Sequence, residues 1–403
     1  TGGGSYSWVV PTVATTDGKI RLTSKGVTPE IVSISTGVFT IASSSIANQP
    51  TGTNMALNGN SFPDNGNGSA VGDSGTVINT TNGGSTWATP PAPIEGIGIR
   101  NLNDISSPSK WTRFVAGDSG TVYKSTNAGL NWSLVNTSSN QNFYSVVFTD
   151  TVTGTITGSN GTILKTTNGG SNWSAQTSGT TKALRDIYFT NASTATAVGD
   201  TGTILFTSNS GSTWTAQNSG TMQNLHGVWF VKNAGVHQIG YAVGDSGTIV
   251  KTTNGGTNWN VLLSPTSKKL NDVAFYTAER GSAVGDGGVV IYTTNGGSMW
   301  KSLVGTGSRN INSIAIPATG GVMFLAGSNG SSFKDTVGIV PVELTSFTAS
   351  NANGKVILNW VTASELNNAG FDVERAFTGA STPISHRTPL SHRASLSPGA
   401  PLS

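Results

Sequence analysis

The sequence contains no cysteine, and this absence excludes a disulfide framework, a thiolate metal site and a thiol nucleophile. It also contains no apolar stretch near the roughly 20 residues that a membrane-spanning helix needs. We therefore expect a chain that does not span a membrane. Thr1-Gly-Gly-Gly-Ser5 lacks the basic start and the apolar core of a signal peptide.

Charged residues are scarce as well. They make up only 10% of the 403 residues, whereas glycine alone contributes 53. The surface must therefore be covered mainly by Ser, Thr, Asn and Gly, which is typical of an exported β-protein. The formal net charge is only +3 and there is no long basic run, so we expect no nucleic-acid partner.

Seven similar stretches follow one another along the chain, and the clearest phrase in them is Val-Gly-Asp-Ser-Gly-Thr. Its first glycine recurs at Gly72, Gly117, Gly158, Gly199, Gly244, Gly285 and Gly327. A period near forty residues indicates a repeat architecture. Each repeat contains several short β-patterned runs and Gly-rich turns. We therefore predict an all-β fold, a seven-bladed β-propeller with one four-stranded blade per repeat.

The fourth repeat shows the pattern of one blade. Leu184–Phe189 has apolar groups on both faces, as expected for a strand enclosed between neighbouring blades. Asp200-Thr-Gly202 predicts a short hairpin between the second and third strands. We name the position of Leu184 the anchor position. Its occupants in the seven repeats are Leu57, Leu102, Phe143, Leu184, Leu225, Leu270 and Ile311.

A second phrase, Thr80-Thr-Asn-Gly-Gly-Ser-Thr-Trp87 in the first repeat, precedes the fourth strand of most blades. It resembles the Asp-box of several propeller families, with Asn in the Asp position. We expect the Asn to cap the turn and the indole to fill the space between blades, which is a structural role. The Asn and Trp residues of these boxes are Asn82, Trp87, Asn127, Trp132, Asn168, Trp173, Asn209, Trp214, Asn254, Trp259, Asn295 and Trp300.

The seventh repeat lacks a box tryptophan, so its fourth strand must come from elsewhere. We predict that Ser5–Trp8, at the N-terminal end, completes this blade next to Phe333 and closes the ring, which removes two exposed sheet edges. The propeller is then expected to span residues 1–337. Residues 11–50 read as two or three further strands, either inserted into the propeller or forming a degenerate eighth blade, and we favour the insertion.

From about Val340 other phrases begin, Val340-Pro-Val-Glu-Leu-Thr-Ser-Phe347 and Leu358-Asn-Trp-Val-Thr-Ala-Ser-Glu365. They resemble the opening of the fibronectin type III-like module found in many cargo proteins of the type IX secretion system, which implies export to the cell surface or medium. Residues 338–380 are too short for such a sandwich of roughly 100 residues, so we expect a truncated module. Residues 381–403 are expected to be a disordered tail, in which His386 and His392 are not a metal site.

Ligands of propellers bind where the loops of the innermost strands converge. Two positions before the anchor the residues are Met55, Arg100, Gln141, Lys182, Gln223, Lys268 and Arg309; one position after it they are Asn58, Asn103, Tyr144, Arg185, His226, Asn271 and Asn312. A ring of cations at one channel mouth would favour an anionic partner. The candidate ligand-binding residues are Arg100, Lys182, Arg185, His226, Lys268 and Arg309. The simpler alternative is that the cations are solvated and pair with Asp104, Asp186 and Asp272.

The order of these phrases over residues 55–335 is similar to that of the photosystem II stability and assembly factor family. The resemblance implies a non-enzymatic propeller that contacts protein partners and carries a basic patch. We expect an exported binding scaffold at the cell surface or in the extracellular matrix, with a protein or glycan partner and with no cofactor, metal or catalytic residue.

The alternatives are a sialidase-like glycoside hydrolase and a structural subunit of a surface fibre. Against the hydrolase, Arg21, Arg100 and Arg113 are not followed by Ile-Pro, and no Tyr-Glu pair of the kind that such an enzyme uses is evident.

Overall fold

The computed structural model describes residues 5–8, 20–25, 28–33, 40–41, 47–91, 100–233, 236–303, 308–317, 322–335, 342–352 and 355–362. The chain divides into two compact units. One consists of residues 45–338, and the other combines residues 1–44 with residues 339–403.

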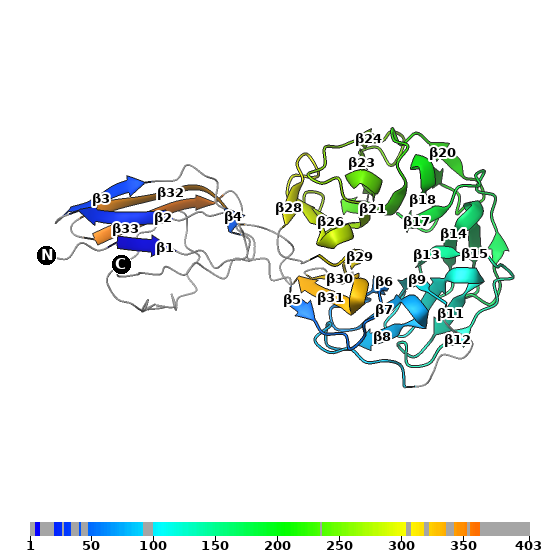
Figure 1. Cartoon of the computed structure of the whole chain (residues 1–403). Coiled ribbons are helices and arrows are strands. Elements are labelled where there is room, and N and C mark those ends of the chain that lie inside the picture. The colour runs from blue at the N-terminus through cyan, green and yellow to red at the C-terminus, as the bar shows by residue number, and fades with distance from the viewer. Residues whose placement is uncertain are drawn as a thin grey trace. The chain divides into compact units, whose positions relative to one another are not determined.

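Residues 45–338 form a closed ring of seven antiparallel sheets, which confirms the seven-bladed β-propeller (Figure 1). The first strands of successive blades contact one another around the ring, and the last, β29 (Ile311–Ala315), contacts the first, β6 (Leu57–Ser61). These strands lie nearest the axis in Figure 1. The anchor residues lie at their beginnings, and all seven are fully buried, with 0% exposure.

In blades 1 to 6 the strands follow the order of the sequence from the axis to the rim, and in blade 7 the outermost strand comes from earlier in the chain. Blade 1 contains β6, β7 (Gly68–Gly72) and β8 (Val77–Thr80), with a bridge between Asn79 and Ala88 at its edge. Blade 2 contains β9 (Leu102–Ser106), β10 (Arg113–Gly117), β11 (Val122–Ser125) and β12 (Ser133–Leu134). Blade 3 contains β13 (Phe143–Phe148), β14 (Gly154–Gly158), β15 (Ile163–Thr166) and β16 (Ser174–Ala175). Blade 4 contains β17 (Leu184–Phe189), β18 (Ala195–Gly199), β19 (Ile204–Thr207) and β20 (Thr215–Gln217).

The remaining blades follow the same plan. Blade 5 contains β21 (Leu225–Asn233), β22 (Val236–Gly244), β23 (Ile249–Thr252) and β24 (Asn260–Val261). Blade 6 contains β25 (Leu270–Phe275), β26 (Gly281–Gly285), β27 (Val290–Thr293) and β28 (Lys301–Leu303). Blade 7 contains β29, β30 (Met323–Gly327), β31 (Ser331–Asp335) and β5 (Ala47–Gln49).

The ring is closed by a strand from the N-terminal part of the chain, as expected, but the segment differs from the one predicted. β5 pairs with β31, and Asn48 lies opposite Phe333. Ser5–Trp8 instead forms β1 and pairs with β2 (Ile20–Lys25), so its assignment to the seventh blade was wrong. β5 directly precedes the first blade, and a short connection between neighbouring elements is the usual choice.

The second and third strands of every blade are joined by a one-turn 3-10 helix. In blade 4 the middle residue of this turn, Thr201, has φ of 57°, and Gly202 follows with φ of 67°. A Cβ on Gly202 would lie 2.0 Å from the carbonyl oxygen of Thr221, so the turn requires glycine there. The seven turns are η1 (Asp73–Gly75), η2 (Asp118–Gly120), η3 (Ser159–Gly161), η4 (Asp200–Gly202), η5 (Asp245–Gly247), η6 (Asp286–Gly288) and η7 (Ser328–Gly330).

The box turns join the third and fourth strands near the rim. In blade 3, Asn168 Oδ1 accepts hydrogen bonds from the backbone N–H of Asn172 at 2.9 Å and from Thr166 Oγ1 at 2.9 Å. The indole of Trp173 packs edge-on against Phe148, with ring centroids 6.0 Å apart. The other box tryptophans also pack against apolar clusters, and Trp300 is only 5% exposed. The indoles therefore join the core.

In the smaller unit, the described strands form two sheets. β1, β2 and β3 (Thr28–Ser33) form one, and β4 (Thr40–Ile41), β32 (Val342–Ala352) and β33 (Lys355–Thr362) form the other. Strands thus exist within residues 11–50, and those before residue 45 lie outside the propeller unit. The likeness of residues 338–380 to a fibronectin module stays a prediction. The tail from residue 381, with His386 and His392, lies outside the described residues.

Candidate functional site

The 3-10 turns and the segments that lead into the inner strands meet at one end of the ring, which we call the turn end. In blade 4, Asp200 donates its backbone N–H to the carbonyl oxygen of Ala183, which precedes the anchor, at 2.9 Å. The next residue of the turn, Thr201, donates its N–H to Asn224 Oδ1 of blade 5 at 2.9 Å. The residues that flank the anchors therefore lie beside the 3-10 turns, near the axis of the ring at this end.

The residue after the anchor is an asparagine in four blades, where it ties neighbouring blades together. Asn103 Nδ2 donates to Asp118 Oδ1 of its own turn at 3.0 Å and to the anchor carbonyl of the next blade, Phe143 O, at 2.7 Å. Asn58 and Asn271 make the same two bonds, and Asn312 donates to Leu57 O at 2.9 Å across the closure of the ring. We name these four residues the interblade asparagines.

Blades 3, 4 and 5 lack this asparagine and have Tyr144, Arg185 and His226 at the same position. Arg185 Nε forms an ion pair with Asp200 Oδ1 of its own turn. Its guanidinium carbon also lies 5.5 Å from the ring centroid of Tyr144, which is within cation–π range. All three side chains are partly buried. We name these three consecutive residues the Tyr-Arg-His sector.

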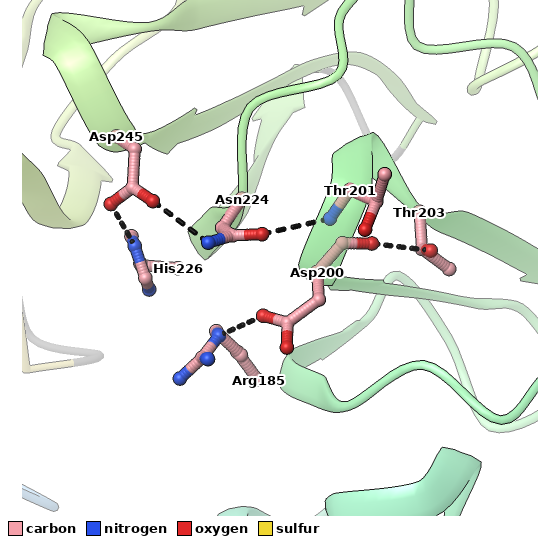
Figure 2. A network of polar contacts seen from close by, with 7 residues as sticks. All are labelled: Arg185, Asp200, Thr201, Thr203, Asn224, His226 and Asp245. Carbon is pink, nitrogen blue, oxygen red and sulfur yellow. Dashed lines mark hydrogen bonds and ion pairs between the residues drawn. The ribbon is translucent and has the colours of Figure 1, made fainter.

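A polar network connects Arg185 and His226 through the intervening turn (Figure 2). Asn224 accepts from Thr201 N–H of blade 4 and donates from Nδ2 to Asp245 Oδ2 of blade 5 at 2.8 Å. Asp245 Oδ1 in turn lies 2.7 Å from His226 Nε2. The side chains of Arg185 and His226 are thus held by neighbouring turns that share one asparagine.

The electrostatics of this network favour a neutral imidazole. Burial lowers the pKa of His226, although the hydrogen bond to Asp245 opposes this change. Burial of Asp245 is outweighed by its hydrogen bonds with His226 and Asn224, so the pKa of Asp245 is lowered. An ionised Asp245 can only accept, so Nε2 of His226 carries the proton and Nδ1 keeps its lone pair.

The Tyr-Arg-His sector also changes which anchor carbonyl groups receive a hydrogen bond from a side chain. Four anchor carbonyls accept a hydrogen bond from the interblade asparagine of the preceding blade, namely those of Leu57, Leu102, Phe143 and Ile311. Among the described residues, the anchor carbonyls of Leu184, Leu225 and Leu270 have no such side-chain donor, because Tyr144, Arg185 and His226 precede them around the ring. These three carbonyl groups can accept hydrogen bonds from a bound molecule.

The other predicted ligand-binding cations are distributed around the turn end. Arg100 Nη1 donates to Ser119 O at 3.3 Å and to Thr121 Oγ1 at 3.1 Å. Lys182, Lys268 and Arg309 are exposed, and their side chains form no hydrogen bond or ion pair within the part of the chain that the structure describes. The role of these residues in binding stays a prediction.

The alternative pairing of cations with the inner-strand aspartates was wrong. Asp104 Oδ2 accepts from the backbone N–H of Val146 at 2.8 Å, in the next blade. Asp186 and Asp272 accept in the same way from the blades that follow them. Because the backbone amides of the next blade face these carboxyl groups, cations are not their partners. Burial raises the pKa of Asp104 to about 6 and that of Asp272 to about 7.

An open groove of about 970 Å³ runs over blade 3 at the turn end. Ser139, Asn160, Trp173 and the segment 177–181 contribute to its walls, and none of its lining residues is charged. The segment leads directly into Lys182 and the inner strand of Arg185. The groove therefore adjoins the blades of the Tyr-Arg-His sector.

Three site residues were not predicted from the sequence. Tyr144 was seen only as one polar member of a ring, and Asn224 and Asp245 were not singled out as partners of His226. The departure of Tyr144 from the repeated asparagine could have identified it. Among the described residues, no three His, Asp or Glu side chains are arranged to hold a metal ion, and no helix is long and apolar enough to cross a membrane.

A closed ring of seven blades, with box turns at its rim and one modified sector at its turn end, defines a β-propeller of the Asp-box class. The chain belongs to the family described as Photosynthesis system II assembly factor YCF48, whose family model matches residues 44–239 and 167–264. No curated protein matches the chain.

Solved structures show the same fold at low sequence identity. The chain is similar to "YCF48 bound to D1 peptide", with 19% identity, a TM-score of 0.64, and coverage of 75% of this chain and 100% of the other. It is similar to YCF48 from Cyanidioschyzon merolae, with 21% identity, a TM-score of 0.62 and coverage of 72% and 98%. The WD40 propeller domain of Doa1 has 11% identity, a TM-score of 0.56 and coverage of 73% and 97%.

Proposed function

We propose that the chain is a non-catalytic, protein-binding propeller of the assembly-factor type, which binds an extended acidic segment of a partner protein at the turn end of blades 3–5. One observation carries this proposal. The asparagine that ties the other blades is replaced in three consecutive blades by Tyr144, Arg185 and His226. Because three consecutive blades lack the asparagine that bonds to the next blade elsewhere in the ring, we infer that the residues at this position serve binding instead of interblade stability.

The chemistry of the sector suits such a segment. Arg185 offers guanidinium N–H groups beyond the one that pairs with Asp200, and Tyr144 offers an aromatic face and a hydroxyl group. The anchor carbonyls of Leu184, Leu225 and Leu270, to which no interblade asparagine donates, suit the N–H groups of an extended backbone. The uncharged groove over blade 3 has room for the rest of the peptide.

Family membership supports protein binding, since one similar structure contains a D1 peptide bound to YCF48. The Gly-rich composition with few charged residues and the fibronectin-like phrases near Val340 support a role outside the cytoplasm. Export is testable by fractionation of cells that make the native protein: we expect it at the cell surface or in the medium, and recovery from the cytoplasm alone would refute this part of the proposal.

Peptide selection tests the binding site. We expect random dodecapeptides displayed on phage and selected on the full chain to be enriched in Asp and Glu. The best peptide, labelled with fluorescein, should bind Arg185→Asn at least about tenfold more weakly, because a charge-assisted contact is lost. Arg280→Asn is the matched control, since Arg280 lies between β25 and β26, away from the turn end. Equal loss in both variants, or selection without acidic enrichment, would refute the proposal.

A further inference from the structure

Ser145, on the inner strand of blade 3, lies between two carboxyl groups of the neighbouring blades. Its Oγ is 3.0 Å from Asp104 Oδ2 of blade 2 and 3.0 Å from Asp186 Oδ1 of blade 4. A hydroxyl group carries one proton and therefore donates one hydrogen bond. If both carboxyl groups were ionised, one of these contacts would bring two oxygen atoms together with no hydrogen between them.

Backbone amides hold both carboxyl groups in place. Asp104 Oδ1 accepts from Ile105 N–H at 2.7 Å, and its Oδ2 accepts from Val146 N–H at 2.8 Å. Asp186 Oδ1 accepts from Ile187 N–H at 2.8 Å, and its Oδ2 accepts from Val228 N–H at 2.8 Å. Neither carboxyl group can turn away from Ser145 without losing such a bond, and leaving a buried amide unpaired is unfavourable.

We propose that Asp104 and Asp186 share one proton across Ser145, so that blades 2, 3 and 4 are joined by a proton-dependent link. The proton comes from solvent and resides on one carboxyl group, which donates to Ser145 Oγ. Ser145 then donates its own proton to the other carboxylate. The pair carries one negative charge in place of two, and every short contact contains a hydrogen.

The charges around the link favour uptake of this proton. Burial raises the pKa of Asp186, and the negative charges that Asp272 on β25 and Asp104 carry when they are ionised raise it further. The nearby cation, Arg185 on the same strand, is already paired with Asp200 in the turn. Strand β13 adds the phenol of Tyr144 and strand β21 adds the imidazole of His226, which is held by Asp245. Strands β14 and β18, which flank the link, contain no charged residue.

The link makes folding depend on pH in a defined direction. The folded state binds a proton that the unfolded chain releases above the ordinary aspartate pKa of 3.8. The stabilisation is therefore complete below that value and is lost as pH rises through the raised pKa of the folded pair. For one proton, the folding equilibrium constant falls by up to about tenfold per pH unit within that window.

Carbon-13 NMR of the aspartate carboxyl groups tests the proposal on the full chain without any ligand, so its outcome is independent of the proposed binding function. We expect one carboxyl group of the pair to remain protonated at neutral pH. In Asp186→Asn the neutral amide can donate to Ser145 only in place of the hydrogen bond with Ile187 N–H, and Ser145 then donates to Asp104, so Asp104 should titrate at least one pH unit lower than in the parent chain. Asp118→Asn, in a turn outside the pair, should leave the titration of Asp104 unchanged.

The mirror variant Asp104→Asn provides a second test should Asp186→Asn fail to fold: the titration of Asp186 must then move to lower pH. Two outcomes would overturn the proposal. The first is that both carboxyl groups of the parent chain are ionised throughout the neutral range. The second is that the titration of the remaining aspartate is unchanged in the folded variant.

Discussion

Blades 6, 7, 1 and 2 form one continuous part of the ring, and blades 3, 4 and 5 form the other. In the first part an asparagine after each anchor bonds to the anchor carbonyl of the next blade, as Asn103 does to Phe143. In the second part the same position holds Tyr144, Arg185 and His226. The anchors of both parts are equally buried. The two parts thus share one core and differ in how neighbouring blades are tied at the turn end.

The difference shows how a repeat protein can hold a specific site. Repetition supplies an internal standard, because six other blades show what the fold alone requires at any position. A residue that agrees with the standard is explained by packing, whereas a cluster of departures calls for another explanation. Asn58 and Asn271 belong to the first kind and Arg185 to the second.

The largest expected effect concerns a feature that both parts share. A Cβ on Gly117 of blade 2 would lie 2.2 Å from Asn101 O, and one on Gly199 of blade 4 would lie 1.9 Å from Ala183 O. We expect Gly117→Ala and Gly199→Ala each to reduce the free energy of unfolding by about 3 kcal/mol or more in urea titrations. Gly255→Ala, with φ of 69° but open space around it, should lose only about 1 kcal/mol. A much milder effect in blade 4 than in blade 2 would mean that the parts do not share one core.

The next effect is a pH dependence of the unfolding free energy that arises outside the Tyr-Arg-His sector. The pKa of Asp272 in blade 6 is raised to about 7 by burial, although the N–H groups of Ile314 and Val273 oppose the rise. Because the folded state holds this proton more tightly, stability should fall as pH rises from about 4 to 7, by up to about 1.4 kcal/mol per pH unit. Asp272→Asn should flatten the dependence measured by urea unfolding at several pH values. An unchanged slope in this variant would assign the dependence to other groups.

The interblade asparagines should be worth less than the core but more than ordinary surface residues. Asn103→Ala removes hydrogen bonds to Asp118 and to Phe143 O, and we expect a loss of about 2 kcal/mol in unfolding free energy. Asn271→Ala, which removes the same two bonds in blade 6, should lose a similar amount. Tyr144→Ala, in the Tyr-Arg-His sector, serves as the comparison. A loss of unfolding free energy as large as that of Asn103→Ala would contradict the distinction between the two parts of the ring.

The repeat made most of the fold predictable. Leu184 and its equivalents could be identified as core because apolar groups recur at one position of each repeat, and Asp200-Thr-Gly202 because a tight turn requires such residues. β5 could not be identified, since Ala47–Gln49 has no apolar pattern and becomes a strand only through its partner, β31. The pairing of β5 with β31, which closes the ring, depends on contacts between residues far apart in the sequence, and the local sequence pattern does not predict such contacts.

The candidate site was predictable only in part. Arg185 and His226 were identified by their charge and position, but Tyr144 was passed over because a search for cations does not find an aromatic residue. The partners of Asp104 could not be foreseen, because the N–H of Val146 approaches it only once neighbouring blades have packed. Electrostatic pairing is a poor guide where backbone amides of another strand are nearer than any side chain.

Restoring the asparagine in the modified sector should reverse the comparison. Arg185→Asn can donate both to Asp200 and to the carbonyl oxygen of Leu225, as Asn103 does in blade 2. We expect the variant to gain about 1 kcal/mol of unfolding free energy, the typical net value of a hydrogen bond, while it loses peptide binding. Arg185→Ala should lose binding without this gain. If Arg185→Asn instead lowers the unfolding free energy, Arg185 itself stabilises the fold and the comparison fails.

The smallest expected effect lies at the rim, where lysines on the third strands reach across to the box turn of the next blade. Lys124 Nζ donates to Gly169 O at 2.8 Å, between blades 2 and 3, and Lys165 Nζ donates to Ser210 O at 2.7 Å, between blades 3 and 4. Both lysines are partly exposed, so each contact should contribute about 0.5–1 kcal/mol. Methionine keeps the aliphatic stem and removes the donor.

Lys124→Met and Lys165→Met should therefore lower the unfolding free energy by similar small amounts in urea titrations, because the Tyr-Arg-His sector changes only the inner strands and the rim contacts are the same in these blades. A larger loss for Lys165→Met would mean that blades 3 and 4 rely on the rim to replace the tie that is missing near the axis, and the sector would then extend through the whole blade.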